Sequence, residues 1–197
     1  MAIPSIGARA RSFRLASAQG GEIGLDDFKN RSAVVVWFTK GMACPFCRQQ
    51  MSQLARAYPS IKEHGGEVLE VTSSTPTRAQ FYARQFKLPF PYLCDPDYRV
   101  RAEWGLQKRS HGPAHYVKTL VKGMSATPPP NDYGAFKPTL GEFPQVLADD
   151  DMGIFVVDRA GVVRYVLAGS YLSEAGPRGI PGGDEILREL ERCATGP

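Results

Sequence analysis

The sequence has few cysteines, no long apolar run and little net charge, and each shortage argues against a class of protein. Four cysteines among 197 residues are too few for a disulfide-stapled scaffold, and a core of this size needs no staples. The longest strongly apolar run covers residues 33–38, far short of the ~18–20 residues of a membrane-spanning helix. The first residues hold no apolar stretch as long as that of a signal peptide. We therefore expect a protein of the reducing cytoplasm without a membrane partner.

The charge balance gives little support to a nucleic-acid partner. Lys and Arg number 24 against 20 Asp and Glu, a formal net charge of +4, which is too mild to imply such a partner by itself. Residues 99–122 interleave basic and aromatic side chains. We interpret this stretch as a solvated helix face, with a basic approach path for an acidic redox partner as the alternative. Its basic residues are Arg99, Arg101, Lys108, Arg109, His111, His115, Lys118 and Lys122.

The order of the sequence patterns predicts a three-layer α/β fold in one domain over residues 1–197. Alternating polar and apolar residues on both sides of Gly20 and Gly21 indicate an N-terminal β-hairpin. An uninterrupted β-branched run is typical of a buried central strand, and a helix with one apolar face follows it, with Pro59 as a candidate kink. The expected elements are a hairpin at 12–25, strands at 34–39, 67–73 and 92–94, helices at about 45–64 and 75–86, and a short helix ending near 104.

Residues 106–150 interrupt this alternation. Their proline-rich and glycine-containing segments indicate an irregular insertion with a short helix at 115–124. An irregular stretch of this length inside a compact domain is often functional. After the insertion we expect an antiparallel hairpin from strands at 153–158 and 162–167, and a final helix at about 183–194.

The motif C-P-F-C at residues 44–47 follows the predicted central strand and opens a helix, which is typical of thiol redox chemistry. The thiolate is the reactive form of cysteine, and the amides and dipole at a helix N-terminus stabilise an anion. Cys44 is expected at the N-cap and Cys47 one turn later on the same side, so that one sulfur attacks and the other resolves the intermediate. Lys40 and Arg48 are candidates to favour the thiolate further.

Two other interpretations of the motif stay open at this point. One is a structural pair of buried cysteines without a chemical role. The other is a zinc site completed by His111 and His115, which have H-x-x-x-H spacing. These histidines lie much farther from Cys47 than in a zinc finger, and the chain has no second C-x-x-C, so we expect neither a metal nor a cofactor.

Four stretches in a fixed order complete a recognisable pattern. They are Gly7-x-x-Ala10-x-Ser12-Phe13-x-Leu15, Val34–Cys47 with the helix after it, Leu93-Cys94-Asp95-Pro96-Asp97, and Phe155-Val156-Val157-Asp158-x-x-Gly161-Val162-Val163-Arg164. With them the chain resembles the peroxiredoxin-like branch of the thioredoxin superfamily, the alkyl hydroperoxide reductase and thiol-specific antioxidant group. The resemblance implies a thioredoxin fold, with a central mixed sheet, flanking helices and the N-terminal hairpin as an extension.

The chain departs from this family around its peroxidatic cysteine. The family's motif is P-x-x-x-T-x-x-C. Alignment on Cys47 puts Cys44 at the threonine and Lys40 at the proline. Alignment on Cys44 puts Gly41 and Trp37 at those positions instead. Neither register restores the motif.

Met152 stands where the family has its peroxide-binding arginine. A peroxide bond must be polarised by hydrogen-bond donors as the leaving oxygen gains charge, so efficient peroxidase activity requires a substitute. Arg109, Arg48 and backbone amides are the candidates.

Of the remaining cysteines, Cys94 is expected in the core and Cys193 on the last helix, with a resolving role as the lesser alternative for each.

The resemblance implies a thiol-dependent oxidoreductase in which Cys44 and Cys47 cycle between dithiol and disulfide while hydroperoxides are reduced. An external thiol system, such as a thioredoxin-like protein, would then reduce the disulfide, and a homodimer is compatible with the family. Exchange with a protein disulfide and a non-catalytic binding module are the alternatives. Helix position favours Cys44 as the attacking sulfur, whereas the peroxiredoxin register favours Cys47.

Overall fold

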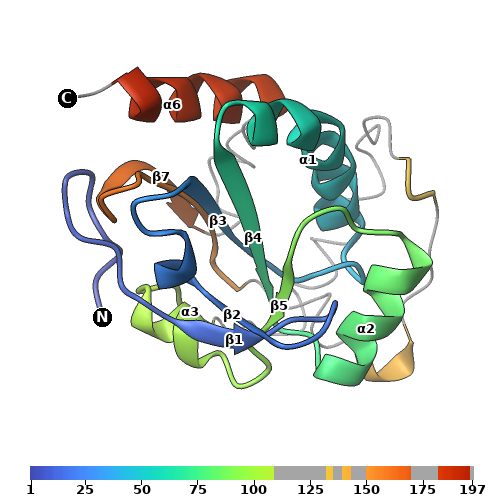
Figure 1. The fold of residues 1–197 in the computed structure, drawn as a ribbon. Coiled ribbons are helices and arrows are strands. Elements are labelled where there is room, and N and C mark those ends of the chain that lie inside the picture. The colour runs from blue at the N-terminus through green and yellow to red at the C-terminus, as the bar shows by residue number, and fades with distance from the viewer. Residues whose placement is uncertain (109–131, 135–138, 143–149, 170–181, 196–197) are drawn as a thin grey trace.

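The computed structural model describes residues 1–108, 132–134, 139–142, 150–169 and 182–195. In this part of the chain, five strands form a sheet in the order β5-β4-β3-β6-β7 (Figure 1). β3, β4 and β5 are parallel, and β6 and β7 are antiparallel to their neighbours, so the sheet is mixed as expected. The strands are β3 (Ala33–Thr39), β4 (Gly66–Thr72), β5 (Tyr92–Cys94), β6 (Met152–Val157) and β7 (Val163–Gly169).

The sheet separates two apolar cores. Helices α1, α2 and α6 pack over one face, while α3 and the hairpin of β1 and β2 pack over the other (Figure 1). The helices are α1 (Pro45–Glu63), α2 (Pro76–Gln85), α3 (Arg99–Glu103) and α6 (Gly183–Thr195), with short 3-10 turns η1 (Leu25–Phe28) and η2 (Leu140–Glu142), and the hairpin strands are β1 (Arg14–Ala16) and β2 (Glu22–Gly24). Cys44 and Cys47 belong to the core under α1.

Strand β3 carries the chain through the centre of the molecule to the cysteine pair. All of its residues are buried, as its run of β-branched and aromatic side chains predicts for a central strand. Trp37 lies in the core under α1, and Phe38 lies in the core under α3. The strand ends at Thr39, directly before the loop that leads to α1.

The predicted elements on both sides of residues 106–150 are confirmed, with bounds within a few residues. Pro59 does not end α1, because the helix continues to Glu63. The helix predicted at 115–124 lies outside the described residues. Among the residues that the structure describes, no helix is long and apolar enough to cross a membrane.

Candidate active site

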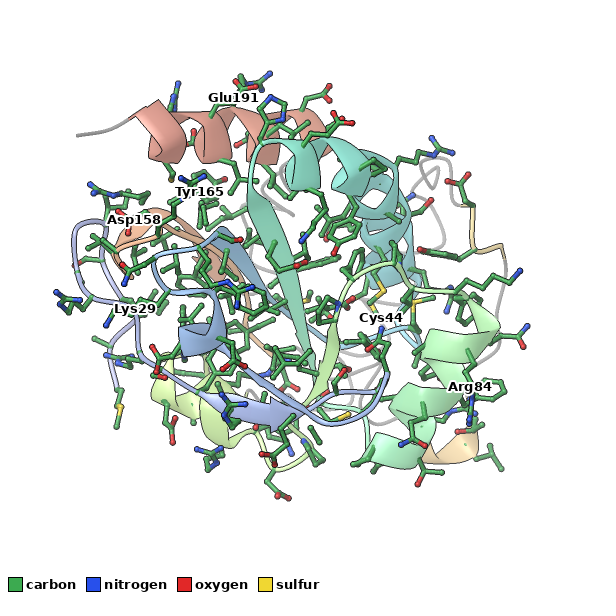
Figure 2. All side chains as sticks on the ribbon, in the orientation of Figure 1. Lys29, Cys44, Arg84, Asp158, Tyr165 and Glu191 are labelled. Carbon is green, nitrogen blue, oxygen red and sulfur yellow. The ribbon has the colours of Figure 1, made fainter. Side chains whose placement is uncertain are left out.

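Cys44 and Cys47 lie at the start of α1, where the sequence predicts them. Cys44 is the N-cap, with extended φ and ψ of −80° and 122°, and a proline at the first helical position fixes the geometry of the first turn. The amide of Cys44 donates to the carbonyl oxygen of Gly41 at 3.1 Å, and the amide of Arg48 donates to the carbonyl oxygen of Cys44 at 3.0 Å. Figure 2 labels Cys44 at this helix start. Both sulfurs therefore sit on the first turn of one helix.

The two sulfurs differ in exposure and in acidity. Both are thiols, not joined by a disulfide, and Cys44 is 5% exposed whereas Cys47 is fully buried. Burial raises the pKa of the Cys47 thiol well above its usual range, and a hydrogen bond to Cys44 and the charge of that residue raise it further. A negative charge on Cys44 therefore favours the protonated form of Cys47.

Two buried basic side chains lie beside the pair. The charge of Lys40 and a hydrogen bond from its backbone lower the pKa of Cys47, opposing burial. Arg48 donates from Nη1 to the carbonyl oxygens of Met42 at 2.6 Å and Ala43 at 3.3 Å. Burial lowers the pKa of Arg48, while the charges of the two cysteines raise it. A thiolate in the pair and the guanidinium therefore stabilise each other.

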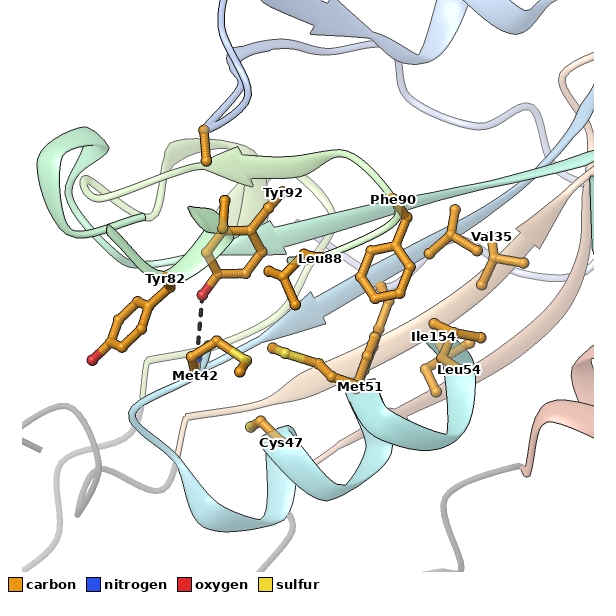
Figure 3. Close-up of a cluster of buried hydrophobic side chains, with 14 of the residues drawn as sticks. Val35, Met42, Cys47, Met51, Leu54, Tyr82, Leu88, Phe90, Tyr92 and Ile154 are labelled. Carbon is orange, nitrogen blue, oxygen red and sulfur yellow. Dashed lines mark hydrogen bonds between the residues drawn. The ribbon is translucent and has the colours of Figure 1, made fainter. Parts of the chain in front are cut away.

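Buried hydroxyls fix the loop before the pair. Gly41 has φ of +81°, and a Cβ built there would lie 2.4 Å from Thr72 Oγ1 and 2.5 Å from Tyr92 Oη, so only glycine fits. The amide of Gly41 donates to Thr39 Oγ1 at 2.8 Å, and the amide of Met42 donates to Tyr92 Oη at 3.2 Å (Figure 3). The loop is held by side chains from β3, β4 and β5.

Glu70, in the middle of β4, is a buried acid beneath this loop. Thr39 Oγ1 donates to Glu70 Oε1 at 2.8 Å. Burial raises the pKa of Glu70 well above its usual range, although this hydrogen bond opposes the rise. Burial also raises the pKa of the Tyr92 phenol. These groups are thus favoured in their neutral forms, and they do not offset the positive charges of Lys40 and Arg48.

Sequence reasoning missed Glu70 and Tyr92, since neither belongs to a motif. The only signal for Glu70 is an acid inside a predicted strand, and Glu67 of the same strand shows it equally. Tyr92 begins a short strand and has no local pattern that marks it.

The other candidate residues lie in different surroundings. Met152 begins β6 and is buried, so a thioether fills the position of the family's arginine. Cys94 is a core residue, as predicted, and burial raises its pKa to about 11. Cys193 is half-buried on α6, and burial raises its pKa to about 11 as well. Neither of these lone cysteines forms a thiolate readily at neutral pH.

Three of the predicted candidates belong to the insertion at 106–150. Arg109, His111 and His115 lie outside the described residues, so the arginine substitute and the zinc alternative that name them stay predictions. In the described part of the chain, no group of three or more His, Cys, Asp or Glu side chains is arranged to hold a metal ion.

The prediction of a solvated helix face is wrong for Arg101. Arg101 is 1% exposed and the neighbouring Trp104 is fully buried, although Arg99 on the same helix is exposed. Asp95 accepts the amides at the start of α3, at 2.9 and 3.1 Å, and so fixes which side of the helix faces the sheet. The Arg101 guanidinium then finds backbone carbonyls as partners. Its charge alone predicts that Arg101 is exposed, because a local sequence pattern does not show hydrogen-bond partners that are distant in the chain.

Known sequences match a large part of the chain. The AhpC/TSA family model matches residues 6–123. A chloroplastic peroxiredoxin Q from Gentiana triflora is 29% identical over 123 residues, which are 62% of this chain and 56% of the relative. A chloroplastic peroxiredoxin Q from Populus jackii is 32% identical over 95 residues, which are 48% of this chain and 44% of the relative. The chain spans about half the length of the curated relatives it matches.

Solved structures show the fold. Peroxidoxin BcpB from Mycobacterium tuberculosis has a TM-score of 0.63 at 17% identity and covers 96% of this chain and 97% of its own. A PrxQ mutant from Xylella fastidiosa has a TM-score of 0.68 at 13% identity and covers 98% of this chain and 99% of its own. The expected thioredoxin fold with a central mixed sheet is confirmed.

Proposed function

The chain belongs to the AhpC/TSA family, and from this membership and its paired thiols we propose that it is a thiol-dependent peroxidase. The observation that carries the proposal is the contact between Cys44 and Cys47, which hydrogen-bond to each other at a helix start beside buried cations. Two thiols in contact can form a disulfide without a distant resolving cysteine.

The proposed cycle is balanced in atoms and electrons. The Cys44 thiolate attacks one oxygen of the hydroperoxide, the O–O bond breaks, and the leaving alkoxide or hydroxide takes up a proton. The resulting sulfenic acid at Cys44 is attacked by Cys47, water leaves, and the 44–47 disulfide forms. A dithiol reductant of thioredoxin type then donates two electrons and two protons and restores both thiols.

Three features support Cys44 as the attacking sulfur. It is the more exposed of the two, it lies at the N-cap, and its partner Cys47 has a raised pKa that disfavours a thiolate there. In the second step Cys47 gives up its proton as it attacks the sulfenic acid, and that proton leaves with the water. Alignment with the family motif favours Cys47 as the attacking sulfur instead. Trapping of the sulfenic acid in each single variant separates the two assignments.

A second candidate function is exchange with a protein disulfide. It is favoured by the departures from the family motif, because Cys44 replaces the hydroxyl donor and Met152 replaces the cation that act on a peroxide. In this cycle the Cys44 thiolate attacks a disulfide of the partner and Cys47 releases the partner as a dithiol. For either cycle we propose a reducing compartment such as the cytoplasm, although the names of the two relatives describe chloroplastic proteins.

The two functions are separated by one equivalent of hydrogen peroxide added to the reduced protein. Mass spectrometry then follows the thiol at each cysteine. For a peroxidase we expect Cys44 and Cys47 to disappear together and rapidly, while Cys94 and Cys193 persist. Cys193→Ser is the matched control and keeps the wild-type rate.

Slow loss with peroxide, together with a fast reaction toward an oxidised protein disulfide, supports the second candidate and contradicts the first. Both cycles need both sulfurs, so Cys44→Ser and Cys47→Ser must each abolish turnover. If neither variant changes any activity, the chain is a binding module and both enzymatic proposals are wrong.

A further inference from the structure

The sheet places a different arginine beside the position that Met152 occupies. The last ladder pair of β3 and β6 joins Phe38 to Gly153, and Thr39 and Met152 are the next residues of the two strands. The Arg101 guanidinium bridges the two strand ends: Nη2 donates to the carbonyl oxygen of Thr39 at 2.6 Å, and Nη1 donates to that of Asp151 at 2.9 Å. We propose that Arg101 is a positioning residue of the cysteine pair, which holds the end of β3 and supplies a positive charge that Met152 does not. This role rests on the proposed function, since it requires a pair that reacts as a thiolate.

A short chain of contacts connects Arg101 to the first cysteine. The guanidinium holds the carbonyl of Thr39, whose hydroxyl accepts the amide of Gly41 at 2.8 Å. The carbonyl of Gly41 in turn accepts the amide of Cys44 at 3.1 Å. Loss of the guanidinium therefore removes one of the contacts that hold Thr39, the residue to which the loop before Cys44 is hydrogen-bonded.

The charge of Arg101 is not cancelled by an ion pair with any carboxylate in the described part of the chain. Its hydrogen bonds go to neutral carbonyls, and its cationic carbon lies 5.9 Å from the ring centre of Phe38 and 5.3 Å from that of Tyr98. Of the nearby acids, Asp95 accepts the amides of α3, and Asp150 accepts the Tyr98 hydroxyl at 2.8 Å. A buried cation acts on neighbouring charges with little screening by water, and the carboxylates of Asp150 and Asp95 offset part of its charge.

The guanidinium and the cysteine pair favour each other's charged forms. Burial lowers the pKa of Arg101, and a negative charge on Cys47 is among the groups that raise it. An interaction between two charges acts equally on both, so Arg101 favours the thiolate form of Cys47. The acids around the guanidinium are Tyr98, Asp150 and Asp95. The groups that face the pair and its loop are the cations Lys40 and Arg48 and the acids Glu70 and Tyr92, both favoured in their neutral forms.

The test is the pH profile of thiol alkylation, which needs no peroxide. Reduced wild type, Arg101→Met and Arg101→Lys are treated with iodoacetamide between pH 5 and 10, and mass spectrometry follows labelling at Cys44. Removing the guanidinium takes away a cation that favours the Cys47 thiolate and a contact that holds the loop before Cys44, so we expect the labelling midpoint at Cys44 to rise by about one pH unit in Arg101→Met. The rate of peroxide-driven disulfide formation at pH 7 falls roughly tenfold and recovers as the pH rises. Arg101→Lys retains the charge and keeps most of the wild-type midpoint.

Val100→Ala is the matched control. Val100 is fully buried on the same short helix, so its truncation loosens α3 without removing a charge. We expect it to lower the thermal midpoint while the alkylation midpoint stays at the wild-type pH. Equal shifts in Val100→Ala and Arg101→Met, or no shift in Arg101→Met, contradict the proposal.

Two outcomes keep the test decisive. If Arg101→Met does not fold, a wild-type alkylation midpoint in Arg101→Lys supports the charge role, and a midpoint raised by about one unit contradicts it. If the wild type ignores peroxide but Arg101→Met still shifts the midpoint, the peroxidase is contradicted while the role of Arg101 toward the pair is supported.

Discussion

Cys44 and Cys47 differ from the lone cysteines in their surroundings more than in their burial. Cys44 and Cys94 are 5% and 4% exposed. Cys94 ends a strand in an apolar setting, and Cys193 lies on α6 away from the pair. The pair instead has a helix start, a partner thiol and two buried cations. Burial alone makes a cysteine inert, and these additions are what make the pair a candidate for chemistry.

The comparison predicts a large difference in alkylation rate. Cys94 and Cys193 have pKa values of about 11, so only about one thiol in ten thousand is ionised at pH 7. We expect iodoacetamide to label Cys44 at least roughly a hundredfold faster than Cys193, although Cys193 is the more exposed. Labelling of Cys193 should rise about tenfold per pH unit until pH 11. Equal rates at Cys44 and Cys193 at pH 7, measured by peptide mass spectrometry, contradict the comparison.

The loop before Cys44, which contains Gly41, has no counterpart at Cys94 or Cys193, and its glycine gives the second prediction. Gly41 and Gly161 share a positive φ, of +81° and +80°, but only Gly41 is enclosed, and nothing lies within 4 Å of a Cβ at Gly161. Either change to alanine strains the backbone by about 1 kcal/mol. Gly41→Ala adds a clash, so we expect a total loss of about 2–4 kcal/mol in the free energy of unfolding. Urea denaturation of both variants measures this. Equal losses of unfolding free energy in the two variants would show that the hydroxyls of Thr72 and Tyr92 move away from the added methyl group at little cost.

A smaller effect is expected from the buried acid beneath the loop. Burial raises the folded pKa of Glu70 above the ordinary 4.5, so the folded state binds its proton more tightly than the unfolded state does. The stability that Glu70 contributes is present below about pH 4.5 and is lost as the pH rises toward the folded pKa, by at most about 1.4 kcal/mol per pH unit. Glu70→Gln removes this loss, so its unfolding free energy falls less between pH 5 and 8.

The control for this prediction is Glu63→Gln, at an exposed position on α1. Its stability is expected to follow the wild-type curve across the same pH range. Parallel curves for wild type and Glu70→Gln would mean that Glu70 titrates as it does in the unfolded chain.

The sequence predicts what local patterns determine and misses what distant contacts determine. The order of strands and helices and the helix start at residues 44–47 follow from periodicity, β-branched runs and turn residues. Arg101 was expected in solvent because its charge is visible in the sequence, whereas its partners are the carbonyl groups of Thr39, at the end of β3, and Asp151, directly before β6. Glu70 and Tyr92 serve the loop only because parallel strands bring their side chains under it. Such contacts depend on the assembled sheet, so local sequence patterns do not reveal them.

The mass of each single variant after one equivalent of hydrogen peroxide tests most directly whether Cys44 is the attacking sulfur. With Cys47→Ser the cycle stops after the first step, so Cys44 is expected to gain one oxygen atom as a sulfenic acid, which dimedone traps at that residue. Cys44→Ser is expected to stay unmodified on the same timescale. Rapid oxygen addition at Cys47 in Cys44→Ser, with Cys47→Ser inert, would contradict the account and make Cys47 the attacking sulfur.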